Sequence, residues 1–244
     1  MKKGKGKKIM IVLPVILLIL AVVAAGGFAW LYFHGLSGMS RVGKAQPGQI
    51  RVACVGDSIT YGHGIANWPE NNYPAVLQKL LGEDYLVNNY GVSGRAVQTD
   101  SDQPYTALPH YRQSLDFQAD ILVFMMGSND AKPENWHDAE TFRAQLETLL
   151  DSYGDCRLIL CTPATAFFLN GETTGTAGFE IQPRVVEQIT EIVREVAEDR
   201  GCELLDIHAL TGENPDWFRS DGIHPDQDGA AAIAKAVAEV ITGA

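Results

Sequence analysis

Short apolar runs alternate with helix-forming segments from residue 51 to the end of the chain, and this alternation restricts the possible folds more than any other feature. The run at 121–126 has six apolar residues in a row, which is typical of a central parallel strand buried on both faces. The pattern predicts strands at 51–55, 85–89, 121–126, 157–161 and 202–206. It predicts helices at 73–81, 138–152, about 182–199 and about 227–242, with an irregular helix within 91–118.

Five strands that alternate with helices indicate an α/β protein with a parallel sheet. Crossovers between parallel strands are almost always right-handed, which places helices on both faces of the sheet. We therefore predict a three-layer α/β/α sandwich around a flavodoxin-like, five-stranded parallel sheet. Open α/β sheets bind ligands at the carboxyl ends of their strands, so functional side chains are expected in the loops that follow the strands.

The N-terminal region has the composition of a membrane anchor. Residues 9–33 include no charged side chain, and these 25 residues can cross a hydrocarbon core of about 30 Å as a helix. Five lysines and no acidic residue precede them, which by the positive-inside rule keeps residues 1–8 in the cytoplasm as a basic tail. We predict a single-pass transmembrane signal anchor at 9–33, a tether at 34–50 and an extracytoplasmic domain at 51–244. A cleaved signal peptide, with secretion of the domain, is the alternative.

Charge restricts the partners of the external domain. The chain has 19 basic and 30 acidic side chains, and five of the basic ones precede the apolar run. The remainder therefore has 14 basic against 30 acidic groups and a net charge of −16. Such a surface repels nucleic acid and anionic lipid headgroups, and it is compatible with a neutral substrate.

The cysteine pattern argues against a metal site. The four cysteines form no C-x-x-C pair, and no histidine cluster has zinc spacing, so we expect neither a metal nor another cofactor. An external location permits disulfides. Cys156 and Cys202 each precede one of two strands that should be neighbours, and we hypothesise that they pair.

A serine and a histidine stand at two predicted loop positions. Gly56, Asp57 and Ser58 directly follow the first strand, but a serine hydroxyl is a poor nucleophile without a base to take its proton. The loop before the last helix has Asp221 three residues before His224. An aspartate there can accept the imidazole Nδ1–H and orient Nε2 toward a serine.

Two further loops provide candidate oxyanion donors, which acyl transfer also requires. Gly91 lies in the loop after the second strand, where its backbone N–H can turn toward a ligand because glycine has no Cβ. Asn129 lies in the loop after the third strand and can offer a side-chain amide. Each motif alone is an ordinary turn, but all of these loops should meet at one edge of the sheet.

In these four segments the chain resembles the SGNH hydrolases, also called GDSL esterases and lipases, and specifically a membrane-anchored member of bacterial type. The segments are 56–58, 91–94, 127–130 and 221–224, and the resemblance extends from about residue 51 to the end. In this resemblance Ser58 takes the position of the nucleophile, and Asp221 and His224 match the family's Asp-x-x-His block. One departure is an isoleucine at position 59, where the family name has leucine.

The resemblance implies a catalytic triad of Ser58, His224 and Asp221. It also implies an oxyanion hole made by the backbone N–H groups of Ser58 and Gly91 and by the amide of Asn129. Further candidate substrate contacts are Asp57, His63, Arg95 and Trp136. His208, after the fifth strand, could also be imagined as the base, but the family block fits His224.

The predicted function is extracytoplasmic serine esterase chemistry on short-chain, chiefly acetyl, esters of carbohydrate. The expected partners are an acylated glycan and, through the N-terminal helix, the membrane, with no nucleic acid. The loop at 162–180 is mostly polar, with Phe167 and Phe168 as its obvious acyl-binding aromatics. The alternatives are a lysophospholipase or thioesterase of the same family, an O-acyltransferase acting on a cell-wall polymer, and a non-catalytic glycan-binding module.

Overall fold

The computed structural model describes residues 18–28, 40 and 42–243, and its centre is a parallel sheet in the order β2-β1-β3-β4-β5. The strands are β1 (Ile50–Gly56), β2 (Tyr85–Asn89), β3 (Ile121–Met125), β4 (Arg157–Cys161) and β5 (Glu203–Leu205). The longer helices are α4 (Tyr73–Leu81), α5 (Pro109–Asp116), α6 (Ala139–Asp151), α7 (Pro183–Arg200) and α9 (Gln227–Thr242). Shorter α-helices are α2 (Ser58–Tyr61), α3 (Trp68–Asn71) and α8 (Ile207–Gly212). The 3₁₀ turns are Tyr105–Ala107, Asn129–Ala131, Leu169–Gly171, Gly178–Glu180 and Pro215–Trp217.

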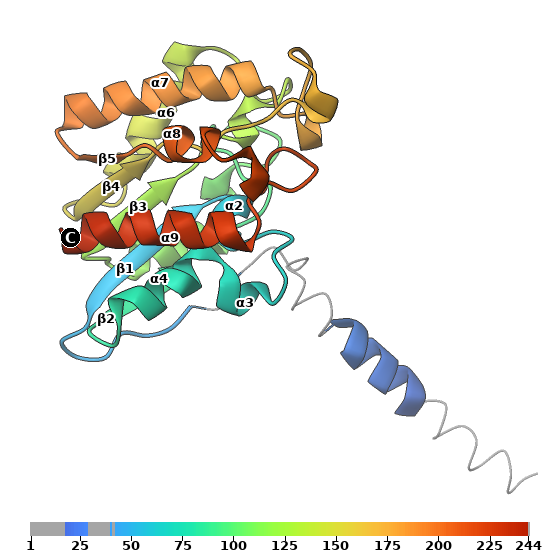
Figure 1. Cartoon of the computed structure of the whole chain (residues 1–244). Coiled ribbons are helices and arrows are strands. Elements are labelled where there is room, and N and C mark those ends of the chain that lie inside the picture. The colour runs from blue at the N-terminus through green and yellow to red at the C-terminus, as the bar shows by residue number, and fades with distance from the viewer. Residues whose placement is uncertain (1–17, 29–39, 41, 244) are drawn as a thin grey trace, which may run out of the picture.

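Helices pack on both faces of the sheet (Figure 1). Successive side chains of a strand point to opposite faces, and the core divides accordingly. Val52 and Cys54 of β1 pack with α4 and α9, whereas Ala53 and Val55 pack with α6 and α7. The predicted three-layer α/β/α sandwich with five parallel strands is therefore confirmed.

Capping side chains set where several elements begin. The helices predicted at 73–81 and 227–242 have these bounds in the structure, and each follows a cap: Asn72 for α4 and Asp226 for α9. The strand predicted at 202–206 is shorter, because Asp206 is the N-cap of α8 and accepts a hydrogen bond from that helix. The four- to six-residue helices α2, α3 and α8 were not predicted, since they are too short to show a helical period.

Part of the predicted tether lies against the edge strand β2. The Gly43 N–H donates to Asn88 Oδ1 at 2.8 Å, and Asn88 Nδ2 donates to the Gly43 carbonyl at 3.0 Å. Gln49 Nε2 donates to the Glu83 carbonyl at 2.8 Å. This end of the 34–50 segment is thus hydrogen-bonded to the domain and covers its open sheet edge.

Residues 18–28 form a helix with exposed side chains. No helix within the described ranges is both long and apolar enough to cross a membrane. The predicted anchor at 9–33 and the basic tail at 1–8 extend over residues outside those ranges, namely 1–17 and 29–33.

The predicted disulfide is wrong: all four cysteines, which the structure describes, are free thiols. The register of β4 and β5 explains why Cys156 and Cys202 do not pair. Ile159 lies opposite Glu203, so continuing the register places Leu158 opposite Cys202. Cys156 is then offset by two residues, about 6–7 Å along the strand, in addition to the spacing between strands. That separation exceeds the reach of a disulfide.

The Phe142 ring of α6 is fully buried, and its centroid lies 6.2 Å from that of Trp136. Replacement of a buried phenylalanine by alanine removes this packing and leaves a cavity, at a typical cost of about 3–5 kcal/mol. We expect Phe142→Ala to lower the free energy of unfolding by that amount, measured by urea unfolding. The control is Leu80→Ala on α4, where the side chain is 53% exposed and the expected change is within about 0.5 kcal/mol. An F142A protein as stable as L80A would contradict the described core.

Candidate active site

Ser58, His224 and Asp221 form one hydrogen-bonded line. His224 Nε2 lies 2.8 Å from Ser58 Oγ, and His224 Nδ1 lies 3.0 Å from Asp221 Oδ2. The Ser58 and His224 residues are 8% and 4% exposed, so water has little access to the hydrogen bond between them. The structure thus brings together the three residues predicted as a triad.

The sequence around Ser58 explains its position at the first turn of α2. A Cβ at Gly56 would overlap Thr60 Oγ1 and lie 2.7 Å from the Met125 carbonyl, so only glycine allows α2 to approach the sheet this closely. Asp57 Oδ1 accepts the Ile59 N–H at 2.9 Å and caps the helix. The N–H groups of a first helical turn have no acceptor within the helix, which leaves the Ser58 N–H directed outward.

The Asp221 carboxylate organises its own turn. Its Oδ1 accepts the N–H groups of Ile223 at 3.0 Å and His224 at 2.9 Å, while its Oδ2 faces the imidazole. Gly222, at φ +70°, allows the chain to turn between them. Partial burial raises the pKa of Asp221, but these hydrogen bonds outweigh burial and hold the pKa well below its usual value. Asp221 is therefore ionised next to His224 and favours the tautomer with the proton on Nδ1.

The Asn129 amide lies close to the residue that precedes Ser58. Its Nδ2 donates to the Arg95 carbonyl at 3.1 Å and lies 3.4 Å from Asp57 Oδ2, on the residue before Ser58. The Asn129 carbonyl in turn accepts Asn135 Nδ2 at 2.8 Å. The structure therefore places the predicted amide donor at the edge of the sheet next to Ser58.

Gly91 is used differently from the prediction. Its N–H donates to Asn89 Oδ1 at 2.8 Å, so in this structure it is not free to hold an oxyanion. A Cβ at Gly91 would overlap the backbone of Thr60 and Tyr61, so the glycine permits close packing of this loop on α2. Sequence reasoning missed this role because the contact joins the loop to α2, a helix that lies far from it in the chain.

Gly94 is a donor candidate that the sequence prediction missed. It has φ +79° and directly precedes Arg95, whose carbonyl accepts the Asn129 amide. Within the described part of the chain, no acceptor is recorded for the Gly94 N–H. The sequence contained one signal for this role, because Gly94 is the second glycine of the 91–94 segment.

Asp130 ties the 91–98 loop to the loop after β3. Its two carboxylate oxygens accept the N–H groups of Val97 at 3.0 Å and Gln98 at 2.9 Å, and the residue is fully buried. Burial raises the pKa of Asp130 to about 7, although these hydrogen bonds oppose it. Burial likewise raises the pKa of Asp57 to about 6, against the hydrogen bond from Ile59.

Aromatic rings surround His224. The His63 ring centroid lies 4.7 Å from that of His224, and the Phe179 centroid lies 5.3 Å away with the rings at 83°. Burial lowers the pKa of His63 to about 4, helped by His224 and Arg219. His63 was a predicted contact, whereas Phe179 was missed because sequence position alone does not bring the 162–180 loop to the histidine.

The other predicted contacts divide into two kinds. Arg95 contributes its carbonyl to the site, and its Nε is buried with no hydrogen-bond partner among the residues that the structure describes. Trp136 packs against Phe142 of α6 and so belongs to the core cluster. Among the aromatic residues of the 162–180 loop, Phe167 packs edge-on against Phe218, with centroids 4.9 Å apart.

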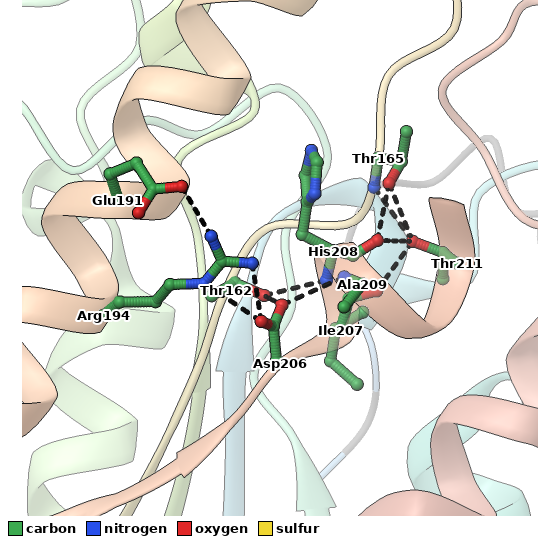
Figure 2. A network of polar contacts seen from close by, with 9 residues as sticks. All are labelled: Thr162, Thr165, Glu191, Arg194, Asp206, Ile207, His208, Ala209 and Thr211. Atoms are coloured by element: carbon green, nitrogen blue, oxygen red, sulfur yellow. Dashed lines mark hydrogen bonds and ion pairs between the residues drawn. The ribbon is translucent and has the colours of Figure 1, made fainter. Parts of the chain in front are cut away.

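His208 serves a structural network at the ends of β4 and β5 (Figure 2). Its backbone N–H donates to Thr162 Oγ1 at 2.8 Å, and its carbonyl accepts Thr165 Oγ1 at 2.7 Å. Asp206 accepts from Thr162 and from Arg194 of α7 in the same network. The network fixes the start of the 162–180 loop. The histidine that contacts Ser58 is His224 and not His208.

Comparison with known proteins assigns most of the chain to one family. Residues 54–232 match the model of the GDSL-like Lipase/Acylhydrolase family. An acetylxylan esterase of Xylanibacter ruminicola is 35% identical over 214 residues, covering 79% of this chain and 43% of that protein. The chain thus spans less than half the length of this curated relative.

Solved structures share the fold. A lipase/acylhydrolase from Enterococcus faecalis superposes with a TM-score of 0.66 at 21% identity, covering 80% of this chain and 96% of the other. A carbohydrate acetylesterase family member from Sinorhizobium meliloti gives 0.62 at 23% identity, with 80% and 98% covered. An aryl esterase of M. smegmatis gives 0.63 at 18% identity, with 80% and 99% covered.

The raised pKa of Asp130 predicts a pH-dependent contribution to stability. Because its pKa rises from 3.8 to about 7 on folding, the folded protein binds the proton more tightly. The contribution of Asp130 to the free energy of unfolding is therefore full below pH 4 and is lost as the pH rises through about 7. We expect the destabilisation caused by Asp130→Asn to be largest near pH 4 and to shrink by pH 8, measured by urea unfolding. Exposed Asp216→Asn is the control, and a D130N cost independent of pH would contradict the assignment.

Proposed function

This chain belongs to the GDSL-like lipase/acylhydrolase family of ester-hydrolysing enzymes, and we propose that it is a serine esterase that removes acetyl groups from carbohydrate. The observation that carries the proposal is the line from Ser58 Oγ through both nitrogens of His224 to Asp221. A hydroxyl within hydrogen-bond reach of an oriented imidazole is the arrangement that nucleophilic acyl transfer requires.

In the proposed mechanism Ser58 Oγ attacks the ester carbonyl while His224 Nε2 takes the hydroxyl proton. Asp221 stabilises the imidazolium that forms. The tetrahedral intermediate collapses when His224 returns the proton to the leaving alcohol, which leaves an acyl-Ser58 ester. Water, activated by His224, then attacks this ester, and Ser58 is regenerated as acetate departs.

We propose three donors for the oxyanion: the Ser58 N–H, the Asn129 amide and the Gly94 N–H. The Ser58 N–H lies in the first turn of α2, and the Asn129 amide lies beside Asp57. Both N–H groups of the Asn129 amide have acceptors in this structure, the Arg95 carbonyl and Asp57 Oδ2, so the amide must release one of them to hold the oxyanion. Gly91 could serve only if Asn89 released its N–H. Removal of one oxyanion donor typically slows catalysis by about 10²–10³.

Three observations support an acetylated glycan as the substrate. The 35%-identical relative is named an acetylxylan esterase, although the chain spans 43% of that protein. Polar groups lie beside Ser58: the Asp57 carboxyl directly precedes it in the chain, and the Asn129 amide lies 3.4 Å from Asp57 Oδ2. The net charge of −16 after residue 33 disfavours an anionic lipid surface.

We also propose that residues 9–33 anchor the enzyme in the cell membrane as a single span, with the catalytic domain outside the cytoplasm. The uncharged 25-residue run and the five preceding lysines support this location. Release after cleavage of a signal peptide is the competing outcome. Membrane fractionation and N-terminal sequencing of the mature protein distinguish the two.

Ser58→Ala and His224→Ala should each lower kcat for ester hydrolysis by about 10⁴ or more, because neither variant can generate the nucleophile. Asn129→Ala should lower kcat by about 10²–10³ through loss of an oxyanion donor. Asp221→Ala should cost less than loss of Ser58, because backbone carbonyls can also orient the imidazole. His208→Ala is the matched control and should remain active. Full activity in S58A would refute the assignment of the nucleophile.

The acyl preference is measured with p-nitrophenyl acetate, butyrate, octanoate and palmitate, together with acetate release from acetylated xylan. We expect kcat/KM to fall at least about tenfold from acetate to octanoate, since the polar Asp57 and Asn129 groups beside Ser58 gain no favourable contact from extra methylenes. Higher kcat/KM on octanoate or palmitate would instead identify a lysophospholipase or thioesterase. Transfer of acetyl to an added wall polymer would identify an acyltransferase, and failure of a fluorophosphonate to label Ser58 would indicate a non-catalytic binding module.

A further inference from the structure

We propose that Phe179, His63 and Arg219 form the subsite for the alcohol part of the ester, and that this alcohol is a pyranose ring stacked on Phe179. The inference rests on the proposed esterase function and adds the leaving group that the site selects.

The mechanism determines which side of Ser58 holds the alcohol. His224 Nε2 takes the proton of Ser58 and returns it to the leaving oxygen, so that oxygen must come within reach of the same nitrogen. The alcohol therefore lies on the His224 side of the serine. The Asn129 amide, one of the proposed oxyanion donors, is directed toward two acceptors, Asp57 Oδ2 and the Arg95 carbonyl.

The wall next to His224 is aromatic and accessible. Phe179 is 56% exposed although its ring lies 5.3 Å from His224, edge to face. The His63 ring centroid lies 4.7 Å from that of His224 and 6.2 Å from that of Phe179. The planes of the His63 and Phe179 rings are at 89° to each other. An exposed phenyl face beside the leaving-group position presents a flat apolar surface, which suits the C–H face of a pyranose.

The Phe179 ring is held in place by a constrained loop. Phe179 and the next residue, Glu180, both have φ +60°, a left-handed conformation that non-glycine residues rarely adopt. The loop is attached to the 221–224 turn at two points that precede the ring in the chain: the Phe167 N–H donates to the Gly222 carbonyl at 2.8 Å, and the Gly178 N–H donates to the Asp221 carbonyl at 2.7 Å. Strained backbone that its surroundings hold in place is typical of functional sites.

The polar half of the subsite consists of His63 and Arg219. The Arg219 guanidinium lies directly over Gly64, where a Cβ would overlap it. Arg219 is exposed, and across the described ranges no hydrogen bond or ion pair of its guanidinium is recorded. Its N–H groups are therefore available to the hydroxyls of a sugar. His63, with its pKa lowered to about 4 by burial, is neutral at pH 7 and offers one donor and one acceptor.

The subsite can be tested with three acetate esters that differ only in the alcohol: a monoacetate of methyl β-xylopyranoside, phenyl acetate and ethyl acetate. Phe179→Gly is the main variant, because glycine removes the ring and retains the positive φ that alanine would strain. We expect the ratio of kcat/KM for the xyloside to kcat/KM for ethyl acetate to fall about three- to tenfold in F179G. Phe179→Tyr, which keeps the ring, should stay within about twofold of the unmodified protein in this ratio.

Arg219→Ala tests the polar half and should lower the same ratio by a similar factor, with phenyl acetate less affected than the xyloside. The matched controls are Leu80→Ala, an exposed apolar side chain on α4, and Arg184→Ala, an exposed arginine on α7. Thermal unfolding of each variant establishes that it is folded at the assay temperature.

An unchanged ratio in F179G overturns the inference, as does an equal loss on all three esters, which would indicate a role in supporting His224. A loss as large on phenyl acetate as on the xyloside would assign the ring to aryl alcohols and would also overturn it. These outcomes differ from failure of the proposed function, in which the unmodified protein hydrolyses none of the three esters.

Discussion

The pairing of β1 with both β2 and β3 is the constraint on which the rest of the site depends. Because β1 lies between these two strands and is parallel to both, the carboxyl ends of all three strands lie side by side. The loops after them bring Ser58, the 91–98 segment and Asn129 to one edge of the sheet. The turn before α9 then closes the arrangement from 166 residues away, through the hydrogen bond between His224 and Ser58.

Buried polar groups hold these loops in register. Asp130 accepts two backbone N–H groups of the 91–98 segment, and Asp57 caps the helix that bears the nucleophile. Both carboxyl groups are buried, and burial raises the pKa of each and so opposes its ionisation. Unpaired buried polar groups are costly, so these acceptors strongly favour the observed loop positions over alternatives.

The segment between β4 and α7 forms the side of the site next to His224. The network of Thr162, Asp206 and Arg194 fixes its beginning, and hydrogen bonds to the carbonyls of Asp221 and Gly222 attach its middle to the triad turn (Figure 2). The proposed alcohol subsite and the turn that holds His224 therefore share one piece of backbone. A change in this segment would be expected to alter both.

Periodicity and local chemistry determined much of this protein from the sequence. Apolar runs such as 121–126 predicted the parallel strands, and helical spacing predicted α4 and α9, because these signals act within a few residues. The placement of Ser58 and His224 at loop positions also followed from strand order. Tertiary structure alone decided which donors are free and which rings reach the base. The Gly91 N–H is occupied by Asn89, Cys156 is out of register with Cys202, and Phe179 lies against His224. The cysteine register and the position of Phe179 depend on contacts between segments distant in the chain, which no local pattern records. The Gly91–Asn89 hydrogen bond spans only two residues, but the Asn89 amide is itself held by the distant Thr60 carbonyl.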